Sequence, residues 1–526
     1  MDKGFTGHNT LMQNLPITPY LDDICTSLKN SPSRFLILTA QTAAGKSTAV
    51  PGALLQAFPG KIIMLEPRRL AVLAIASRVS ELLGEQIGQT AGYRMHLDSC
   101  VSSKTRFEVI TEAILTRKLQ ADPSLEGTDV VVIDEFHERS IHADLALAFL
   151  KEAMLLRDNL YVIVMSATID TQPLAAFLGT GSIPAPVFRV PGRQFPVAIE
   201  YAGIMNPSLA VLHELQKKIT EPENNSILVF LPGIGDIRNC QKELIEQHAD
   251  ADILLLHSSI DFTEQQKVLE MPRPGAKRRV ILSSAIAETS LTVPGVTTVI
   301  DSGLSRINLL IVSAGMEKLV TEKESIFSAE QRAGRAGRTS PGRCIRLWNE
   351  NDAHILQTQP EILRTDLTAL VLECIQWGIS TPEKLQWLTP PSAAAWNAAL
   401  HLLQQMNCIT LQNDGLASIT RQGKAVLKLG LSPRLACTAL YSVQTALRYS
   451  TYKDASSFLQ KKFCSDTERR IKNLNSAPDE FRTDTLPIAK NTAALLAGFP
   501  DRLAHKTDSP DVYQFPSGRL ASLPEH

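Results

Sequence analysis

The sequence predicts an α/β protein with two tandem parallel-sheet domains, followed by a winged-helix unit and a helical bundle. Three observations predict this fold. Short apolar runs rich in Val, Ile and Leu recur along the chain, helical patterns lie between these runs, and the texture changes after residue 355. A chain of 526 residues is also too long for one core, because cores stop growing near about 250–300 residues.

The apolar runs form two series that predict two sheets. They are RFLILTA, KIIMLEP, DVVVIDE and YVIVMSA, then SILVFLP, DILLLHS, RRVILSS and TTVIDSG. Such runs are typical of strands buried on both faces, and helices between them imply parallel sheets with right-handed crossovers. The stretch VPGRQFPV separates the two series. We therefore predict one domain over residues 1–190 and a second over residues 191–355.

The rest of the chain has a different pattern. EILRTDLTALVLECIQWGI and SAAAWNAALHLLQQM carry apolar residues at helical spacing, and NCITLQNDGLASITRQGKAV predicts a hairpin that turns at residues 413–415. Two helices and a hairpin indicate a winged-helix unit over residues 356–431. From Ser432 onward the chain is expected to be mostly helical, so residues 432–526 are predicted to hold a helical bundle and the start of a C-terminal extension.

The composition limits the classes of function. The formal net charge is −1, so a nucleic-acid site would have to be a local basic channel on a neutral protein. The eight cysteines form no C-x-x-C pair and are interpreted as reduced thiols. No long apolar run suggests a membrane segment, and MDKGFTGHNTLMQ has no apolar core or cleavage signal. We expect a cytoplasmic protein.

The stretch TAQTAAGKST indicates a phosphate-binding loop, because it follows an apolar run and precedes a helical pattern. Lys46 would give a positive charge to the β- and γ-phosphates, and Ser47 would offer its hydroxyl to Mg²⁺. Ala43 would be strained by about 1 kcal/mol or more at positive φ, but alanine removes no backbone N–H donor. The predicted nucleotide-binding residues are Ala40, Gln41, Thr42, Ala43, Ala44, Gly45, Lys46, Ser47 and Thr48.

VVVIDEFHERS places two acidic residues at the end of a buried strand. The carboxyl edge of a parallel sheet is the usual ligand crevice, and paired carboxylates there suit Mg²⁺. We predict a metal site made by Ser47, Asp134 and Glu135, in which Glu135 orients or deprotonates the attacking water. The alternative, a charged surface turn, does not suit a strand end this apolar.

The segment QRAGRAGR spaces Arg332, Arg335 and Arg338 three residues apart, so on a helix they would share one broad face. Guanidinium forks suit phosphate oxygens, and the small residues between them would let a facing surface approach. The alternative is a solvated basic helix.

These motifs, in this order, resemble the DEAH-box helicases of superfamily 2, and the box D-E-F-H is similar to that of the HrpB-type bacterial branch. Further matching stretches are LEPRRLA, GYRMH, TEAILTR, SAT, LVFLPG and SSAIAETSLT. The resemblance implies two RecA-like domains that bind ATP, or another nucleoside triphosphate, with Mg²⁺ between them. It also implies a monomeric motor.

The resemblance assigns roles to individual residues. Gln331 would position the lytic water, and Arg335 and Arg338 would be arginine fingers that arrive when the domains close. Arg78 matches the arginine that stacks on the base, although Leu269 stands where its partner is usually Phe. The implied catalytic residues are Lys46, Asp134, Glu135, Gln331, Arg335 and Arg338, and Ser290 is an implied nucleotide contact.

The resemblance also implies contacts with single-stranded RNA, with single-stranded DNA as the other candidate. These contacts would come from Arg68, Arg69, Thr111 and Ser284, and the coupling residues would be His137, Ser166 and Thr168. Arg68 and Arg69 could instead form ordinary ion pairs. Residues 307–325 match the family's strand-separating hairpin.

We expect an ATP-dependent RNA helicase or translocase that moves 3′ to 5′. The alternatives are an RNA-stimulated ATPase clamp that remodels RNA–protein complexes and a nucleotide-binding scaffold without turnover. No protein partner can be read from the sequence.

Overall fold

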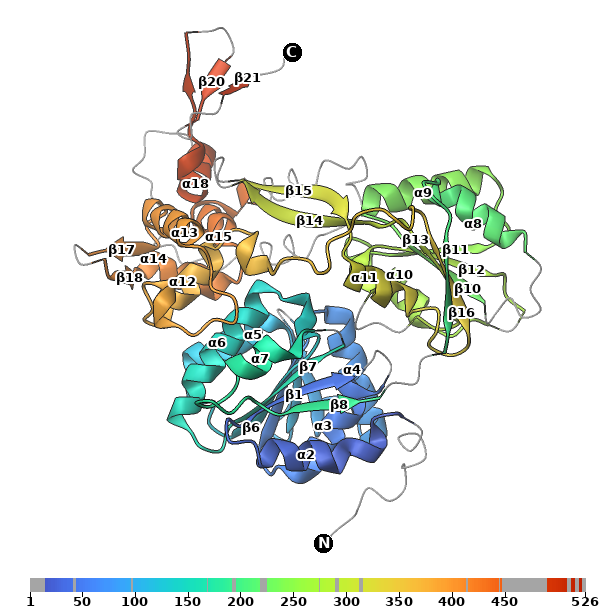
Figure 1. Ribbon diagram of the computed structural model, residues 1–526. Coiled ribbons are helices and arrows are strands. Elements are labelled where there is room, and N and C mark those ends of the chain that lie inside the picture. The colour runs from blue at the N-terminus through green and yellow to red at the C-terminus, as the bar shows by residue number, and fades with distance from the viewer. Residues whose placement is uncertain are drawn as a thin grey trace.

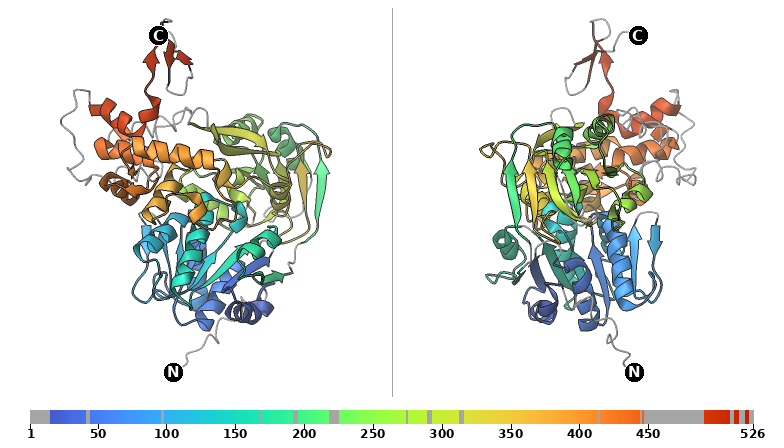
Figure 2. Two further views of the ribbon diagram at one scale, coloured as in Figure 1. Left: turned by 60° about the vertical axis from the view of Figure 1, so that its left-hand side comes forward. Right: turned by 90° about the vertical axis from the view of Figure 1, so that its right-hand side faces the viewer.

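The computed structural model describes residues 15–40, 44–95, 98–167, 169–191, 195–217, 225–273, 275–288, 293–311, 316–412, 415–443, 445–446, 490–508, 512–515 and 520–522. In Figure 1 the first sheet lies at the bottom, the second at the upper right and the C-terminal helices at the upper left. Both views of Figure 2 show the two sheets as separate bodies. Within the described ranges, every helix is too short or too polar to cross a bilayer.

The first sheet has eight strands in the order β4-β3-β5-β2-β6-β7-β1-β8. Every pairing is parallel except that of β4 with β3. The strands are β1 (Phe35–Ala40), β2 (Lys61–Leu65), β3 (Ala91–Met95), β4 (Asp98–Cys100), β5 (Phe107–Ile110), β6 (Thr128–Ile133), β7 (Tyr161–Ser166) and β8 (Val187–Val190). The helices that accompany them are α2 (Leu21–Lys29), α3 (Lys46–Ala57), α4 (Arg69–Leu83), α5 (Glu112–Ala121), α6 (Ile141–Leu156) and α7 (Thr171–Phe177).

The second sheet has six parallel strands in the order β11-β12-β10-β13-β16-β9. They are β9 (Val197–Tyr201), β10 (Ser226–Phe230), β11 (Asp252–Leu256), β12 (Arg279–Ser283), β13 (Val296–Asp301) and β16 (Gly342–Arg346). Its helices are α8 (Pro207–Leu215), α9 (Ile234–Glu246), α10 (Phe262–Leu269) and α11 (Ile326–Ala333). The antiparallel hairpin of β14 (Leu304–Ile311) and β15 (Met316–Lys323) extends from this domain.

The two parallel sheets confirm the predicted pair of α/β domains. All eight apolar runs contain strands, and burial on both faces explains the composition of all but the edge strand β11, which is only partly buried. β8 belongs to the first sheet and β9 to the second, on either side of the predicted linker. The domain limits themselves stay predictions.

The C-terminal region begins with a short 3₁₀ helix and continues mostly as helices. Its elements are η6 (Glu361–Leu363), α12 (Thr368–Gln376), α13 (Ala393–Gln405), β17 (Ile409–Leu411), β18 (Ala417–Ile419), α14 (Arg421–Leu429), α15 (Pro433–Tyr441), α18 (Lys490–Gly498), β19 (His505–Lys506), β20 (Val512–Gln514) and β21 (Leu520–Ser522).

This order is consistent with the predicted winged-helix unit, which stays a prediction together with the bundle. β17 and β18 pair antiparallel, as expected of the hairpin, but Asn413 and Asp414 of its predicted turn lie outside the described residues. The sequence analysis missed the small antiparallel sheet β19-β20-β21, because strands of two or three residues carry no readable alternation.

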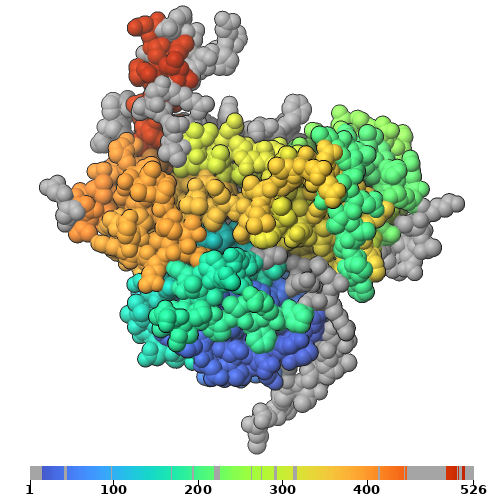
Figure 3. Space-filling view, viewed as in Figure 1, coloured from blue at the N-terminus to red at the C-terminus, as the bar shows by residue number. Residues whose placement is uncertain are grey.

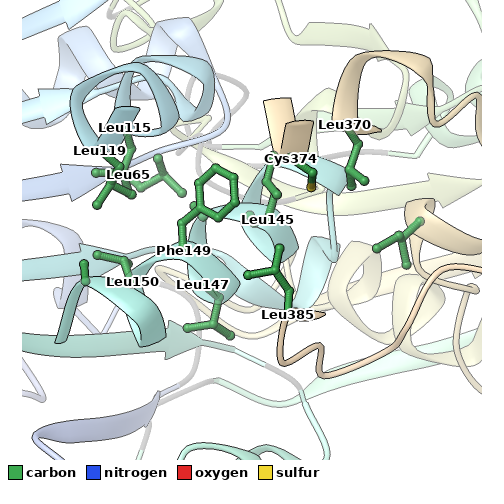
Figure 4. Close-up of a cluster of buried hydrophobic side chains, with 14 of the residues drawn as sticks. Leu65, Leu115, Leu119, Leu145, Leu147, Phe149, Leu150, Leu370, Cys374 and Leu385 are labelled. Carbon is green, nitrogen blue, oxygen red and sulfur yellow. The ribbon is translucent and has the colours of Figure 1, made fainter. Parts of the chain in front are cut away.

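The first domain and the C-terminal region share one hydrophobic core. Helix α6 is apolar on nearly all sides, since it packs between the first sheet and α12. Figure 4 shows Leu145 and Phe149 of α6 beside Leu370 and Cys374 of α12. The ring of Phe149 stacks on Trp377, with centroids 4.3 Å apart and planes 12° from parallel. These contacts hold the C-terminal region to the first sheet, and Figure 3 shows it resting above that domain.

Substitution Phe149→Ala should therefore destabilise both parts together. Phe149 is fully buried, and truncating such a side chain costs about 3–5 kcal/mol. Calorimetry should show a lower transition temperature for the first domain and the C-terminal region alike. Leu156→Ala, at a position 63% exposed, is the control and should change stability by less than about 0.5 kcal/mol. A Phe149→Ala protein that melts like the control would contradict the shared core.

Candidate active site

The phosphate-loop segment turns between β1 and α3 through Gly45. This residue has φ +91°, and a Cβ there would lie 2.8 Å from a methyl carbon of Leu15, so a glycine is required. Ala40 ends a strand and therefore carries no left-handed strain. Gln41, Thr42 and Ala43 lie outside the described residues, so the expectation about Ala43 stays open.

Lys46 and Ser47 form the first turn of α3. Lys46 is 6% exposed, and its Nζ donates a hydrogen bond of 2.8 Å to the carbonyl of Ala40. Ser47 Oγ donates to Asp134 Oδ2 at 2.5 Å. Thr48 Oγ1 lies 3.4 Å from the carbonyl of Gly45. The loop thus meets the end of β6, and the N-terminus of α3 adds its partial positive charge there.

Asp134 and Glu135 are buried directly after β6. Glu135 has φ +50°, and its N–H donates to Asp134 Oδ1 at 2.8 Å, which fixes this left-handed turn. Burial and the neighbouring Glu135 raise the pKa of Asp134 to about 7, although Lys46 and Ser47 oppose the shift. His137 Nδ1 lies 3.5 Å from Glu135 Oε2.

This donor set fits Mg²⁺. The Ser47 hydroxyl and the Asp134 carboxylate are adjacent hard oxygen donors, the kind that Mg²⁺ prefers. Two buried carboxylates side by side are costly unless a cation compensates them. Ser47 and Asp134, with Glu135 beside them, are therefore the residues that could hold the ion.

Two arginines of the second domain, Arg335 and Arg338, interact electrostatically with Glu135 of the first domain. Burial lowers the pKa of Arg335 and Arg338, the latter to about 10, whereas the carboxylate of Glu135 raises both. Because guanidinium groups stay protonated in proteins, these are buried positive charges on which the carboxylate of Glu135 acts from the other domain. Arg335 also donates to the carbonyl of Glu288, and Gln331 is buried in α11.

The prediction that three arginines share one helix face was wrong. Helix α11 ends at Ala333, so Arg335 and Arg338 lie in the turns that follow it. Arg332 lies inside the second domain, where its Nη1 is 2.9 Å from Asp301 Oδ1 and its Nε is 3.1 Å from Glu288 Oε2. Its guanidinium group therefore pairs with carboxylates inside the second domain.

Arg68 forms contacts between the two domains. Its Nη2 pairs with Glu138 at 3.0 Å, and its Nη1 donates to the carbonyls of Ala285, at 3.1 Å, and Ile286. The ion pair that the sequence left open is therefore present. Each of the four predicted nucleic-acid residues follows the carboxyl end of a strand and is half-buried: Arg68 and Arg69 after β2, Thr111 after β5 and Ser284 after β12.

The remaining predicted residues are placed as follows. Arg78 lies on α4 and pairs with Glu81 at 3.1 Å on the surface, and Leu269 packs partly buried at the end of α10. Ser166 is buried at the end of β7. Thr168 and Ser290 lie outside the described residues.

Sequence reasoning missed Glu288, which binds two arginines at once. Its carbonyl accepts from Arg335 and its carboxylate pairs with Arg332. The signal that could have identified it was its position in the motif SSAIAETSLT, four residues after Ser284.

A phosphate-loop segment and paired carboxylates follow strands of the first sheet, and arginines of the second domain interact electrostatically with Glu135. This arrangement is that of P-loop proteins with two RecA-like domains. A family model described as DEAD/DEAH box helicase matches residues 22–177, and one described as helicase conserved C-terminal domain matches residues 210–340. The chain belongs to the DEAD/DEAH-box helicase family, which confirms the resemblance seen in its motifs.

Similar proteins carry helicase names. The ATP-dependent RNA helicase HrpB of Escherichia coli (strain K12) is 37% identical over 97% of this chain and 64% of its own length. The probable ATP-dependent RNA helicase DHX34 of Homo sapiens is 33% identical over 79% of this chain and 37% of its own length. The crystal structure of the Escherichia coli DEAH/RHA helicase HrpB matches with a TM-score of 0.80 and 35% identity, over 97% of this chain and 66% of that one. The chain thus spans less than two thirds of the curated relatives it matches.

The raised pKa of Asp134 predicts a pH-dependent stability. Its pKa of about 7 exceeds the roughly 3.9 of an unfolded aspartate, so folding favours the protonated carboxyl. The stability that this group contributes is therefore fully present below about pH 4 and is lost as the pH rises through 7. The nucleotide-free protein should melt at a lower temperature at about pH 8 than at about pH 5.5, and Asp134→Asn should flatten this slope.

The control is Asp122→Asn, because hydrogen bonds from Ser124 lower the pKa of Asp122 and it does not titrate in that interval. Melting curves for Asp134→Asn that keep the full wild-type pH dependence would contradict the assignment.

Proposed function

We propose that the protein is an ATP-dependent RNA helicase or translocase that couples hydrolysis between its two sheet domains to 3′-to-5′ movement along single-stranded RNA. The observation that carries the proposal is the electrostatic interaction of Arg335 and Arg338, both buried in the second domain, with Glu135 of the first. The names of the similar proteins support RNA as the nucleic acid. Residues 1–190 and 191–355 would be the motor domains, in a monomeric, cytoplasmic protein.

The chain's own residues account for phosphoryl transfer. Lys46 would exchange the Ala40 carbonyl for the β- and γ-phosphates, which the N–H groups of α3 also bind. Glu135 would take the proton of the attacking water, and Gln331 would help to orient that water. Mg²⁺, when held by Ser47 and Asp134, neutralises phosphate charge. Arg335 and Arg338 would turn from Glu135 to the charge that develops in the transition state.

Movement would follow from closure of the domains around the nucleotide. The predicted RNA contacts of both domains lie at carboxyl strand ends, so a strand bound there would touch both sheets. Such contacts bind the phosphate backbone without reading sequence. His137 would connect the RNA side to Glu135, which it already approaches, and Ser166 and Thr168 would be the other coupling residues.

A second candidate is an RNA-stimulated ATPase clamp that does not unwind processively. The contacts of Arg68 favour it, because this predicted phosphate-binding residue is already engaged with Glu138 and the second domain. Strand displacement on a 3′-tailed duplex, measured beside ATP turnover, separates the two functions.

Arg335→Ala should abolish turnover but keep nucleotide binding. An arginine finger acts on the transition state and contributes about 10³–10⁵ to the rate, so kcat should fall by at least about 10³. Fluorescent-nucleotide titration should show a Kd within about ten-fold of wild type, because the nucleotide in its ground state would be bound mainly by the first domain. Arg335→Lys should restore little of the lost turnover, since the lysine ammonium lacks the planar fork of a guanidinium group. Turnover near the wild-type rate would exclude the finger role.

The substrate prediction is tested by the nucleic acid that stimulates hydrolysis. Single-stranded RNA should raise ATP turnover more than DNA of the same sequence, and the rise should weaken with salt because the contacts are to phosphates. Lys46→Ala is the control: it should remove the protein's own turnover, so any activity that remains comes from a contaminant. Equal stimulation by both polymers would reject RNA preference while leaving the motor class intact.

A further inference from the structure

Residues 359–366, which we call the junction segment, contact both motor domains. The segment follows the second domain in the chain and contains η6. Figure 1 shows it between the hairpin β14-β15 and the C-terminal helices, above the first sheet. It therefore lies where the three parts of the molecule meet.

One end of the junction segment is joined to the loop that follows Glu135. The N–H of Glu361 donates to the carbonyl of Arg139 at 3.1 Å, and Glu361 Oε2 accepts from the N–H of Ile141 at 3.1 Å. Ile141 is the first residue of α6, so this carboxylate lies at a helix N-terminus, where negative charge is favoured. Arg139 is itself held by Asp144, at 3.0 Å.

The other end is joined to the hairpin near its tip. The N–H of Leu310 donates to the carbonyl of Arg364 at 2.6 Å, and Arg364 Nη1 donates to the carbonyl of Asn308 at 3.1 Å. The N–H of Asp366 lies 3.3 Å from Glu317 Oε1. In the register of the hairpin, Leu310 and Glu317 form the pair next to the last one, Ile311 and Met316.

An ion pair connects the two ends. Arg364 Nη2 lies 3.6 Å from Glu361 Oε1, and the arginine side chain is only 12% exposed. Arg364 Nε also donates to the carbonyl of Gln359 at 3.1 Å. One arginine thus fixes the hairpin, the segment and the carboxylate that binds α6.

We propose that Glu361 and Arg364 are positioning residues that couple ATP hydrolysis to strand displacement, by holding the hairpin to the loop that follows Glu135. This inference rests on the proposed helicase function. Neither residue is placed at the nucleotide, and their contacts join an element of the second domain to one of the first. The hairpin is held near its tip by a segment that is anchored on the first domain. When the second sheet moves relative to the first, the hairpin would therefore press against the duplex.

The test compares Arg364→Ala with a matched control, Arg157→Ala. Arg157 also binds two backbone carbonyls, those of Ser124 and Leu125, but lies within the first domain. Three quantities are measured: ATP turnover without RNA, turnover with single-stranded RNA, and displacement of a 3′-tailed RNA duplex. For Arg364→Ala we expect turnover without RNA within about two-fold of wild type, and displacement per ATP lowered by about five-fold or more. Arg157→Ala should leave displacement per ATP unchanged.

Two further variants keep the test decisive if Arg364→Ala folds poorly. Arg364→Lys retains the charge beside Glu361 but loses the fork, and should give an intermediate loss of displacement per ATP. Glu361→Gln should also lower this ratio, and combining it with Arg364→Ala should add little, because residues that act as one unit are not additive.

Wild-type displacement per ATP in Arg364→Ala would overturn the inference while leaving the proposed function standing. If the wild type displaces no strand but RNA stimulates it, the ratio of stimulated to unstimulated turnover becomes the readout, and the same loss is expected. A wild type that RNA does not stimulate at all would reject the proposed function and the inference with it.

Discussion

A buried carboxylate of the first domain interacts electrostatically with two buried guanidinium groups of the second, and the proposed chemistry depends on this interaction. Glu135 comes from the first sheet, and Arg335 and Arg338 come from the second. Removing these charges from water is expensive, so each group needs a partner of opposite sign. Glu135 acts electrostatically on both arginines, and Arg335 also donates to the carbonyl of Glu288. A nucleotide bound at Lys46 would offer the arginines a more strongly charged partner than Glu135. Their attraction to its phosphates would favour closure of the two domains.

The first domain shares a buried apolar cluster with each of the other two parts of the molecule. The C-terminal region shares a hydrophobic core with the first sheet through α6 and the stacked rings of Phe149 and Trp377. The second domain contacts the first through Arg68 and the carbonyls of Ala285 and Ile286, and buried apolar residues of both domains, such as Met165 and Phe230, belong to a second core cluster. The first domain is therefore the part that packs against both of the others.

The sequence predicted the strands that carry long apolar runs and missed those that do not, including the interior strands β3, β5 and β16. Runs such as VVVI are apolar because both faces of their strands are buried, and this burial made them readable. Strands such as β9, which lies at an edge and is largely exposed, lack that signal. Arg332 was misjudged because its partners Asp301 and Glu288 are distant in sequence. The junction at Glu361 and Arg364 could not be predicted for the same reason, since only the tertiary fold brings it to the hairpin.

The most direct measurement is an experimental structure with ADP, Mg²⁺ and tetrafluoroaluminate, which mimics the phosphoryl group in transfer. The account predicts that nitrogen atoms of Lys46, Arg335 and Arg338 lie about 3 Å from the fluorine atoms, with the carboxylate of Glu135 beside the attacking water. The contradicting result is an occupied phosphate loop in which Arg335 and Arg338 point away from the analogue while the two sheets are closed.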